Sequence, residues 1–244
     1  MTSLTLDSIS LRNAGVVQIT QSKKGHRLTL DSILLADFCR LKPGARILEP
    51  GAGSGVISIL LAKKFPATAF FAVEVQQDLV RLCRENVLRN DLEGRVSVLE
   101  GNLGEVKRSS AMPETFDAIV ANPPYTRSGA GRQSPDAGRQ IARHNQSGSL
   151  ETWLDLGTSL RNRGAYFLVF PAARTGELLS LLRERKLEPK RLRFVHPQAD
   201  KPASIVLVEA KKTAGVGLEV MPPLIVHAEG GGYSEEVRTI YGPS

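Results

Sequence analysis

The stretch that most restricts the fold is Asn122-Pro123-Pro124-Tyr125, which directly follows the apolar run 116–121. A short, largely apolar run of this kind is typical of a buried β-strand. Neither proline can donate a hydrogen bond to a neighbouring strand, so the strand has to end at Asn122. The side-chain amide of Asn122 is therefore expected at the carboxyl end of a strand, where ligands bind in open α/β sheets.

The residue types of this tetrapeptide suit methyl transfer to a planar nitrogen. The lone pair of an exocyclic amine is delocalised into the attached π-system. The Asn122 amide oxygen and the Pro123 carbonyl, both accepting from that amine, would favour a pyramidal nitrogen and expose its lone pair. Tyr125 offers a face for stacking, worth ~1–3 kcal/mol per base. The structural alternative for these four residues alone is a turn selected for backbone geometry.

Composition narrows the class of protein. The chain of 244 residues fits one α/β domain with small extensions. It has no apolar run near the ~20 residues that span a bilayer and no secretory signal pattern, so no membrane association is expected. Cys39 and Cys83 fall in helical patterns, which predicts small buried hydrophobes in a reducing compartment such as the cytoplasm. The four histidines lack ligand spacing, so no metal is predicted.

Charge points to a polyanionic partner. The net charge is +7 and the isoelectric point is about 9.6, which fits nucleic acid, although a basic soluble surface is the simpler alternative. Much of the excess positive charge falls in two segments, residues 1–30 and 126–146, each with four basic residues and one acidic residue. The second of these follows the tetrapeptide directly. The expected state is a monomer or a homodimer.

Hydrophobic periodicity predicts alternating strands and helices along most of the chain. This alternation favours an α/β fold with a doubly wound, mostly parallel sheet of seven strands. The predicted strands cover residues 45–49, 68–75, 96–99, 116–121, 165–170, 193–195 and 203–210, the last two as an antiparallel pair. The predicted helices cover residues 31–41, 56–64, 77–90, 149–160 and 177–186.

The remaining segments define the expected domain limits. Residues 4–30 alternate loosely and predict a β-hairpin or two short strands. We therefore expect residues 1–30 to form a small β extension and residues 31–244 the main domain, with Asp31 capping its first helix. Residues 126–146 predict a long loop, which in a compact domain is often functional. The tail after residue 210 shows little pattern.

The turn after the first predicted strand of the main domain is rich in glycine, and a nucleotide-like ligand should bind there. Gly51, Gly53 and Gly55 alternate with other residues, and Val56 follows where a dinucleotide fingerprint needs glycine. Glu49 precedes the turn by two residues, and a carboxylate there attracts an ammonium group rather than a phosphate. The turn thus favours a ligand that carries an amino group.

Polar residues also end the next two predicted strands. Glu74 ends the second and can accept hydrogen bonds from both hydroxyls of a ribose. Asn102 follows the third and is placed to hydrogen-bond an adenine edge. A solvated strand end and a simple turn residue are the structural alternatives for these two positions. Together, an amino group, a ribose and an adenine describe S-adenosylmethionine, which leaves as S-adenosylhomocysteine.

These residues carry a resemblance to known families. The segment 49–55 resembles the first motif of class I methyltransferases, which have a Rossmann-like fold, and Asn122-Pro123-Pro124-Tyr125 resembles the catalytic motif of their amino-methyltransferases. Three further stretches resemble the tRNA1(Val) adenine-37 N6-methyltransferase family, namely 23–27 with 29–35, 141–144, and 232–237.

The resemblance implies methylation of the adenine just 3′ of a valine tRNA anticodon. The implied catalytic residues are Asn122, Pro123, Pro124 and Tyr125. The implied cofactor residues are Asp31, Glu49, Gly51, Ala52, Gly53, Gly55, Glu74, Val75, Asn102 and Asn122. The resemblance also implies Arg143 and His144 close to the substrate entrance, and Lys23, Lys24 and Arg27 are predicted to bind the substrate through its phosphates. Two positions depart from the family pattern, since Asn102 and Asn145 replace the usual Asp and Glu, and Asn102 keeps an acceptor for adenine.

The expected mechanism is a single displacement on a flipped-out base. The adenine would leave the anticodon loop and enter a pocket beneath the long loop, because an enzyme acting on a base has to unstack it. Orientation of the amine against the donor can supply ~7–11 kcal/mol. No strong general base is required, because the proton leaves a cationic amine. Phosphate contacts from the basic residues should make binding weaken with salt.

Other functions use related residues. A glutamine-N5 methyltransferase of release factors would use the same tetrapeptide, but such enzymes usually carry a helical domain before the core, and the early residues here predict β structure. A guanine-N2 rRNA methyltransferase more often has Phe at the place of Tyr125. A DNA adenine methyltransferase would need a sequence-reading domain for which the chain has no room. A non-catalytic RNA-binding module with a relic site would not bind S-adenosylmethionine.

Overall fold

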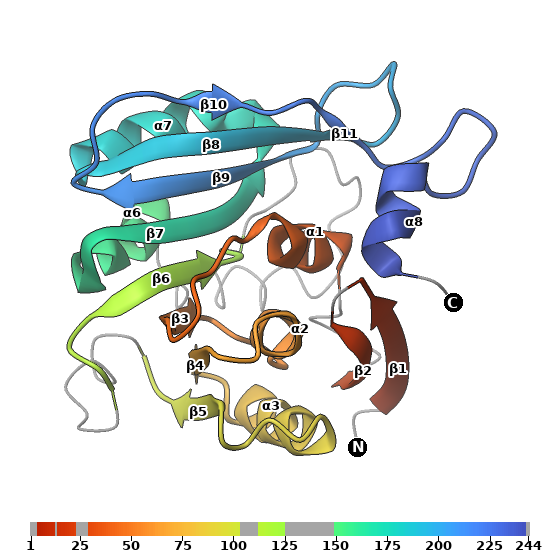
Figure 1. The fold of residues 1–244 in the computed structure, drawn as a ribbon, viewed down its shortest axis with the longest axis vertical. Coiled ribbons are helices and arrows are strands. Elements are labelled where there is room, and N and C mark those ends of the chain that lie inside the picture. Colours follow the sequence, from red (N-terminus) through yellow and green to blue (C-terminus); the bar gives the residue numbers. More distant parts are fainter. Residues whose placement is uncertain (1–3, 13, 23–28, 103–111, 125–148, 243–244) are drawn as a thin grey trace, which may run out of the picture.

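The computed structural model describes residues 4–12, 14–22, 29–102, 112–124 and 149–242 (Figure 1). Several predicted site residues lie outside these segments, and their roles stay predictions: Lys23, Lys24, Arg27, Tyr125, Arg143 and His144, with the predicted loop 126–146. No helix in the described segments is both long and apolar enough to cross a membrane.

A central sheet runs through the molecule and has nine strands within the described residues. They are β3 (Arg46–Pro50), β4 (Ala69–Glu74), β5 (Val96–Glu100), β6 (Phe116–Ala121), β7 (Leu160–Pro171), β8 (Leu187–His196), β9 (Ile205–Lys212), β10 (Glu219–Val220) and β11 (Leu224–Ile225). Their order is β10-β8-β9-β7-β6-β3-β4-β5, and β11 also pairs with β8. β9 runs antiparallel between β7 and β8, and all other pairs are parallel. The predicted seven-stranded, mostly parallel sheet is confirmed, and the two-residue strands β10 and β11 extend its edge.

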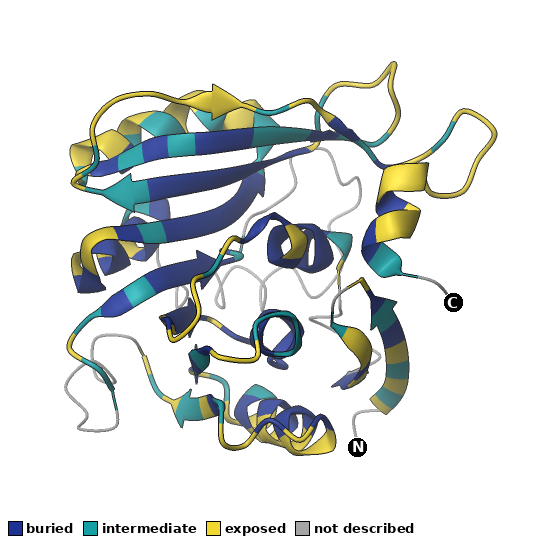
Figure 2. Cartoon of the chain, viewed as in Figure 1, coloured by how far each residue is buried: buried dark blue, intermediate teal, exposed yellow. Residues whose placement is uncertain are grey.

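Helices cover both faces of the sheet (Figure 1). On one face lie α1 (Leu30–Phe38), α2 (Val56–Lys64) and α3 (Gln77–Arg89), and on the other α6 (Leu150–Leu154) and α7 (Thr175–Glu184). The short 3₁₀ helices η1 (Asp155–Ser159) and η2 (Ala172–Arg174) flank β7. Successive strand residues point to opposite faces, so neighbours such as Ile47 and Leu48 enter different cores. The central strands are therefore buried on both sides (Figure 2), which explains their continuous apolar sequence.

The N-terminal residues form the expected hairpin. β1 (Leu4–Leu11) and β2 (Gly15–Ser22) pair antiparallel, with Leu11 opposite Gly15. Apolar residues of both strands, including Ile9 and Ile19, are buried in the same core as α1, α2 and α3. The hairpin is thus packed against the main domain rather than standing apart from it.

Two buried asparagines of α3 hold the hairpin in place. The Asn86 side chain accepts a hydrogen bond from the Thr20 N–H (2.8 Å) and donates to the Thr20 carbonyl (2.9 Å). Four residues later, the Asn90 side chain accepts from the Gln18 N–H (3.1 Å) and donates to the Gln18 carbonyl (2.7 Å). The helix thereby satisfies backbone groups of β2 as a neighbouring strand would.

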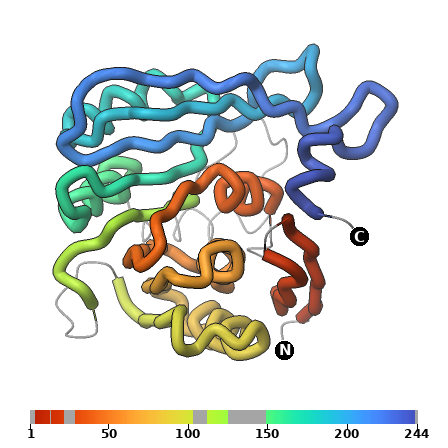
Figure 3. The backbone as a smooth tube through the Cα atoms, viewed as in Figure 1, coloured from red at the N-terminus to blue at the C-terminus, as the bar shows by residue number. Residues whose placement is uncertain are grey.

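The C-terminal part of the chain returns to this hairpin. Helix α8 (Glu235–Tyr241) lies beside β1, as the red and blue ends of the tube show in Figure 3. The Arg12 N–H donates to the Ile240 carbonyl (3.0 Å), and Ile240 joins the core that contains the hairpin. Both ends of the described chain therefore brace one side of the domain.

Three sequence predictions about these elements are wrong. Asp31 does not cap α1; Thr29 does, with its hydroxyl accepting from the Ser32 N–H, and the helix ends at Phe38 rather than near residue 41. The predicted helix 149–160 gives way to η1, and Leu160 already belongs to β7. The tail after residue 210, for which no element was predicted, contains β10, β11 and α8, because short elements on the edge of a domain need little periodicity.

Candidate active site

The carboxyl ends of four parallel strands bring predicted site residues into one row. The strands lie in the order β5-β4-β3-β6. Asn102 follows β5, Glu74 ends β4, the glycine turn follows β3, and Asn122 follows β6. The Gly101 N–H donates to the Glu74 carbonyl (3.0 Å), which ties the first two strand ends together. The row lies at the edge of the sheet where a ligand was expected.

The glycine turn shows where the backbone is open to a ligand. Gly51, Gly53 and Gly55 all have left-handed backbones, with φ of 61°, 58° and 84°. A Cβ at Gly51 would lie 2.6 Å from Cη2 of Trp153, whereas a Cβ at Gly53 would meet no atom within 4 Å. Trp153 is buried in the core and packs against the turn. The open side at Gly53 is where a cofactor can approach the backbone.

Glu49 is a buried carboxylate with no ion pair among the described residues. Its side chain is 3% exposed, and Oε2 accepts hydrogen bonds from the Ser58 N–H (2.8 Å) and the Ser58 hydroxyl. Burial raises the pKa of Glu49 to about 8, although both Ser58 hydrogen bonds lower it. An acid buried in this way is stabilised in its charged form by a bound cation. The residue fits the ammonium group of S-adenosylmethionine.

Glu74 is already used by the backbone around it. Its Oε2 accepts from the Gly53 N–H (2.8 Å), and its Oε1 accepts from the N–H groups of Val75 and Gln76 (2.9 Å each). A carboxylate has about four acceptor positions, so three are taken. Glu74 thus fixes the glycine turn to the end of β4. Its predicted contact with both ribose hydroxyls requires the ribose to share these acceptors.

Asn122 leaves the sheet at the end of β6, as its two prolines require. Its side chain is half-buried, and its Nδ2 donates to the Ser32 hydroxyl of α1 over 3.4 Å. Pro123 is buried and Pro124 is half-buried. The amide therefore lies at the rim of the sheet beside the start of α1, and it is not packed into the core.

The other predicted cofactor residues fall around this row. Asp31 is buried in the first turn of α1, next to the serine that contacts Asn122. Ala52 is buried, and its N–H donates to the Val73 carbonyl (3.0 Å). Val75 and Asn102 are exposed. The placements are compatible with the predicted site, and the roles of these residues stay predictions.

The row of site residues lies within a segment of the chain that matches a known protein family. Residues 22–147, more than half of the chain, match the family described as methyltransferase small domain. The chain belongs to this family. The S-adenosylmethionine-dependent methyltransferase expected from the sequence is thereby confirmed, and S-adenosylmethionine is its cofactor.

Curated relatives in this methyltransferase small domain family match nearly the whole chain. The tRNA1(Val) (adenine(37)-N6)-methyltransferase of Parabacteroides distasonis is 30% identical over 227 residues, covering 91% of this chain and 92% of that protein. The protein of the same name from Aeromonas salmonicida is 29% identical over 240 residues, covering 95% and 97%. The family resemblance predicted from the sequence is confirmed.

A solved structure supports the fold. The crystal structure of a predicted O-methyltransferase from Agrobacterium tumefaciens has a TM-score of 0.67 and 21% sequence identity. It covers 85% of this chain and 93% of that protein. The Rossmann-like methyltransferase fold that the family resemblance implies is therefore confirmed.

Sequence reasoning missed three residues that support the site. Ser58 holds Glu49, Trp153 supports Gly51, and Asn86 donates to the Ser54 carbonyl of the glycine turn (3.0 Å) as well as binding the hairpin. One signal was available for Asn86, because it lies on the apolar stripe of α3 beside Cys83 and Val87, where a polar residue needs partners. Ser58 and Trp153 carry no such signal.

Cys39 and Cys83 are both buried free cysteines, as predicted. Burial raises the pKa of each thiol well above its usual value. The thiolate is the reactive form, so both side chains act as packing groups.

Proposed function

We propose that this methyltransferase methylates N6 of an adenine in RNA, and that the adenine is residue 37 in the anticodon loop of valine tRNA. Two relatives that match more than nine-tenths of the chain are named for this reaction. The observation that carries the proposal is the half-buried amide of Asn122 at the end of β6, the strand next to β3 and its glycine turn.

The residues at the strand ends have separate roles in this proposal. Glu49 binds the amino group of the cofactor, and the open backbone at Gly53 lies against it. Bound S-adenosylmethionine supplies an electrophilic methyl group. The Asn122 amide oxygen and the Pro123 carbonyl accept from the N6 amine and hold its lone pair toward that methyl group, and Tyr125 stacks on the base. This arrangement catalyses by orientation, without a strong base.

The setting of the reaction is also part of the proposal. The enzyme acts in the cytoplasm on tRNA, as a monomer or a homodimer, and residues 1–30 form an extension to the main domain. Lys23, Lys24, Arg27, Arg143 and His144 contact the RNA. Asn86 contacts both Thr20 of β2 and Ser54 of the glycine turn, and this closeness of β2 to the turn supports a role for the basic residues that follow β2 in the sequence.

The test is the site of methylation in a strain that lacks the gene. Total RNA and total protein from that strain are incubated with the purified enzyme and tritiated S-adenosylmethionine, and the labelled position is mapped. Label at N6 of adenine 37 in valine tRNA supports the proposal. Label on a glutamine of a release factor, on a guanine of ribosomal RNA, or on no macromolecule would overturn it.

A further inference from the structure

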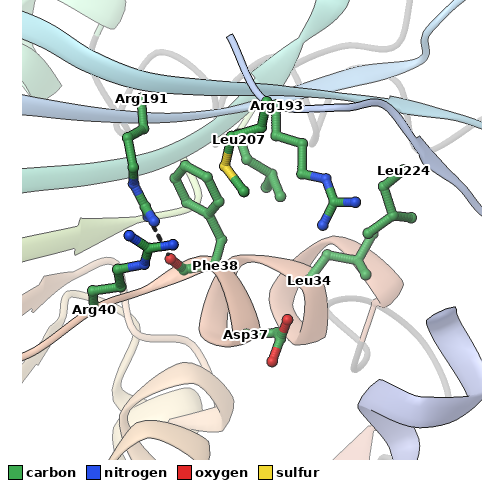
Figure 4. A pocket seen from close by; sticks show the side chains of 9 residues that line it. Leu34, Asp37, Phe38, Arg40, Arg191, Arg193, Leu207 and Leu224 are labelled. Atoms are coloured by element: carbon green, nitrogen blue, oxygen red, sulfur yellow. Dashed lines mark hydrogen bonds between the residues drawn. The ribbon is translucent and has the colours of Figure 1, made fainter. Parts of the chain in front are cut away.

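A second feature lies toward the end of α1, whereas Asn122 contacts Ser32 near its start. A cavity of about 140 Å³ opens between α1 and strands β8 and β9, and three arginines line it: Arg40, Arg191 and Arg193 (Figure 4). Phe38 and Leu207 contribute apolar walls. One water occupies about 30 Å³ in the liquid, so the cavity has room for a group several times larger.

Arg191 is rigidly held at one end of this cavity. Its side chain is buried, and its Nε lies 2.7 Å from Oε2 of Glu209. Its Nη2 donates to the Phe38 carbonyl (2.8 Å), and its guanidinium lies 4.4 Å from the centre of the Phe38 ring. These contacts fix the guanidinium in a pre-organised position.

Arg193 is held at the other end of the cavity, as Figure 4 shows. Its Nε donates to the Pro222 carbonyl (3.0 Å), and its Nη2 lies 2.7 Å from Glu236 of α8. The side chain is only 14% exposed although it carries a charge. The two strand arginines are thus anchored before any ligand binds.

The charges around the cavity do not balance. Glu209 forms ion pairs with two cations: Arg191 at its Oε2, and Lys211, whose Nζ lies 3.4 Å from its Oε1. Arg193 is balanced by Glu236, whereas exposed Arg40 forms no ion pair with any residue in the described segments. The remaining acid, Asp37, is paired with Lys64 (3.3 Å). Among the described residues, five cations (Arg40, Arg191, Arg193, Lys64 and Lys211) therefore lie with three acids (Asp37, Glu209 and Glu236), and this excess of two positive charges favours a bound anion.

The cavity lies within reach of the same ligand as the active site. Ser32, near the start of α1, contacts Asn122, and Phe38, at the end of the same helix, lines the cavity. Six residues of α-helix separate Ser32 and Phe38 by ~9 Å along the helix axis at 1.5 Å per residue, and Arg40 follows two residues after the end of the helix. A single nucleic acid strand whose base enters the active site can therefore place a nearby phosphate at the cavity.

We propose that this arginine cavity binds a backbone phosphate of the RNA substrate, with Arg40 as its principal contact. The inference rests on the proposed function for its choice of RNA as the source of the phosphate. Arg40 supplies a guanidinium that has no ion pair within the described part of the chain, and Arg191 and Arg193 supply a fixed positive field. A guanidinium recognises a phosphate with two parallel hydrogen bonds, which a lysine cannot reproduce.

The test compares Arg40→Ala with Arg89→Ala, which removes the same charge from an exposed arginine on α3. Binding of a fluorescently labelled valine tRNA anticodon stem-loop is measured by anisotropy from ~50 to ~200 mM salt. We expect Arg40→Ala to lower the salt slope by about 1 and to weaken binding several-fold, with Arg40→Lys in between. S-adenosylmethionine affinity should be unchanged in all three variants.

Two results would overturn the cavity site: an unchanged salt slope in Arg40→Ala, or an equal loss in Arg40→Ala and Arg89→Ala. Arg40 is exposed, so a loss of folding is not expected to obscure the comparison. The test of the arginine cavity can fail or succeed independently of the proposed methylation reaction. Wild-type protein that binds the stem-loop but does not methylate it would contradict the reaction, while the salt slopes would still decide whether Arg40 contacts a phosphate.

Discussion

At the scale of single residues, the site depends on groups whose folded environment differs strongly from water. Glu49 is the clearest case, because it is buried, accepts two hydrogen bonds from Ser58 and has no cation beside it in the described segments. Burial raises its pKa in the cofactor-free protein to about 8, which favours the protonated form. Binding of an ammonium group changes that preference.

The first prediction concerns pH and Glu49. A carboxyl whose folded pKa is raised stabilises the fold below its unfolded pKa and loses that contribution as pH rises toward the folded value. The free energy of unfolding of the cofactor-free protein should therefore fall as the pH rises from about 5 to about 8. In the Glu49→Gln protein, the contribution of Glu49 to this fall should be absent. Urea denaturation without cofactor, over that pH range, measures both slopes. Equal slopes in the two proteins would rule out a raised pKa at Glu49.

The second prediction separates the two kinds of glycine in the turn. The added methyl group of Gly53→Ala contacts no neighbour, so the substitution should lower the free energy of unfolding only by the ~1–2 kcal/mol of a left-handed non-glycine residue. The same methyl group should block the approach of the cofactor to the backbone. Gly51→Ala also clashes with Trp153 and should destabilise the protein more. Thermal unfolding and S-adenosylmethionine titration of both variants check this. A Gly53→Ala protein with normal cofactor affinity would show that the open side of the turn does not face the ligand.

At the scale of elements, α3 does more than cover the sheet. Asn86 and Asn90 replace a strand partner along β2, and Asn86 also holds the glycine turn through the Ser54 carbonyl. The hairpin and the turn therefore share one buried side chain. A change in the hairpin can reach the cofactor site through this contact.

The third prediction follows from that shared contact. Asn86→Ala leaves buried backbone groups of Thr20 and Ser54 unpaired, and each unpaired group should destabilise the fold by ~1–3 kcal/mol. The substitution should therefore weaken both cofactor binding and the packing of the hairpin on α3. Asn90→Ala is the matched control, since its partners are Gln18 and the backbone of its own helix. Hydrogen exchange at the Thr20 and Gln18 amides reports the hairpin, and S-adenosylmethionine titration reports the turn. Equal cofactor affinities in the two variants would contradict the coupling.

At the scale of the whole molecule, the sequence predicts the sheet better than its surroundings. The strand 116–121 and the helix 56–64 were predicted with their observed bounds, because a buried strand ended by prolines and a glycine turn followed by apolar residues leave few alternatives. Helix α8 was missed because only Val237 and Ile240 of its seven residues are buried. Periodicity is informative only when a long face is covered.

The candidate site likewise contains residues that the local sequence predicts and partners that it does not. Residues at strand ends, such as Glu74 and Asn122, could be predicted because local sequence sets where a strand stops. Their partners could not, because Ser32 and Asn122 are ninety positions apart and meet only through the packing of α1 on the sheet. The arginine cavity joins α1 to β8 across an even longer separation, and no local pattern indicates it.

The most direct measurement is the behaviour of Asn122→Ala with the exposed Asn162→Ala as control. Methyl transfer to adenine 37 of a valine tRNA transcript is followed in single turnovers, and S-adenosylmethionine affinity is measured on the same preparations. The amide role predicts that Asn122→Ala loses turnover by a factor of at least ~100 while it still binds the cofactor, and that Asn162→Ala matches the wild type. Wild-type turnover in Asn122→Ala would contradict the role of this amide.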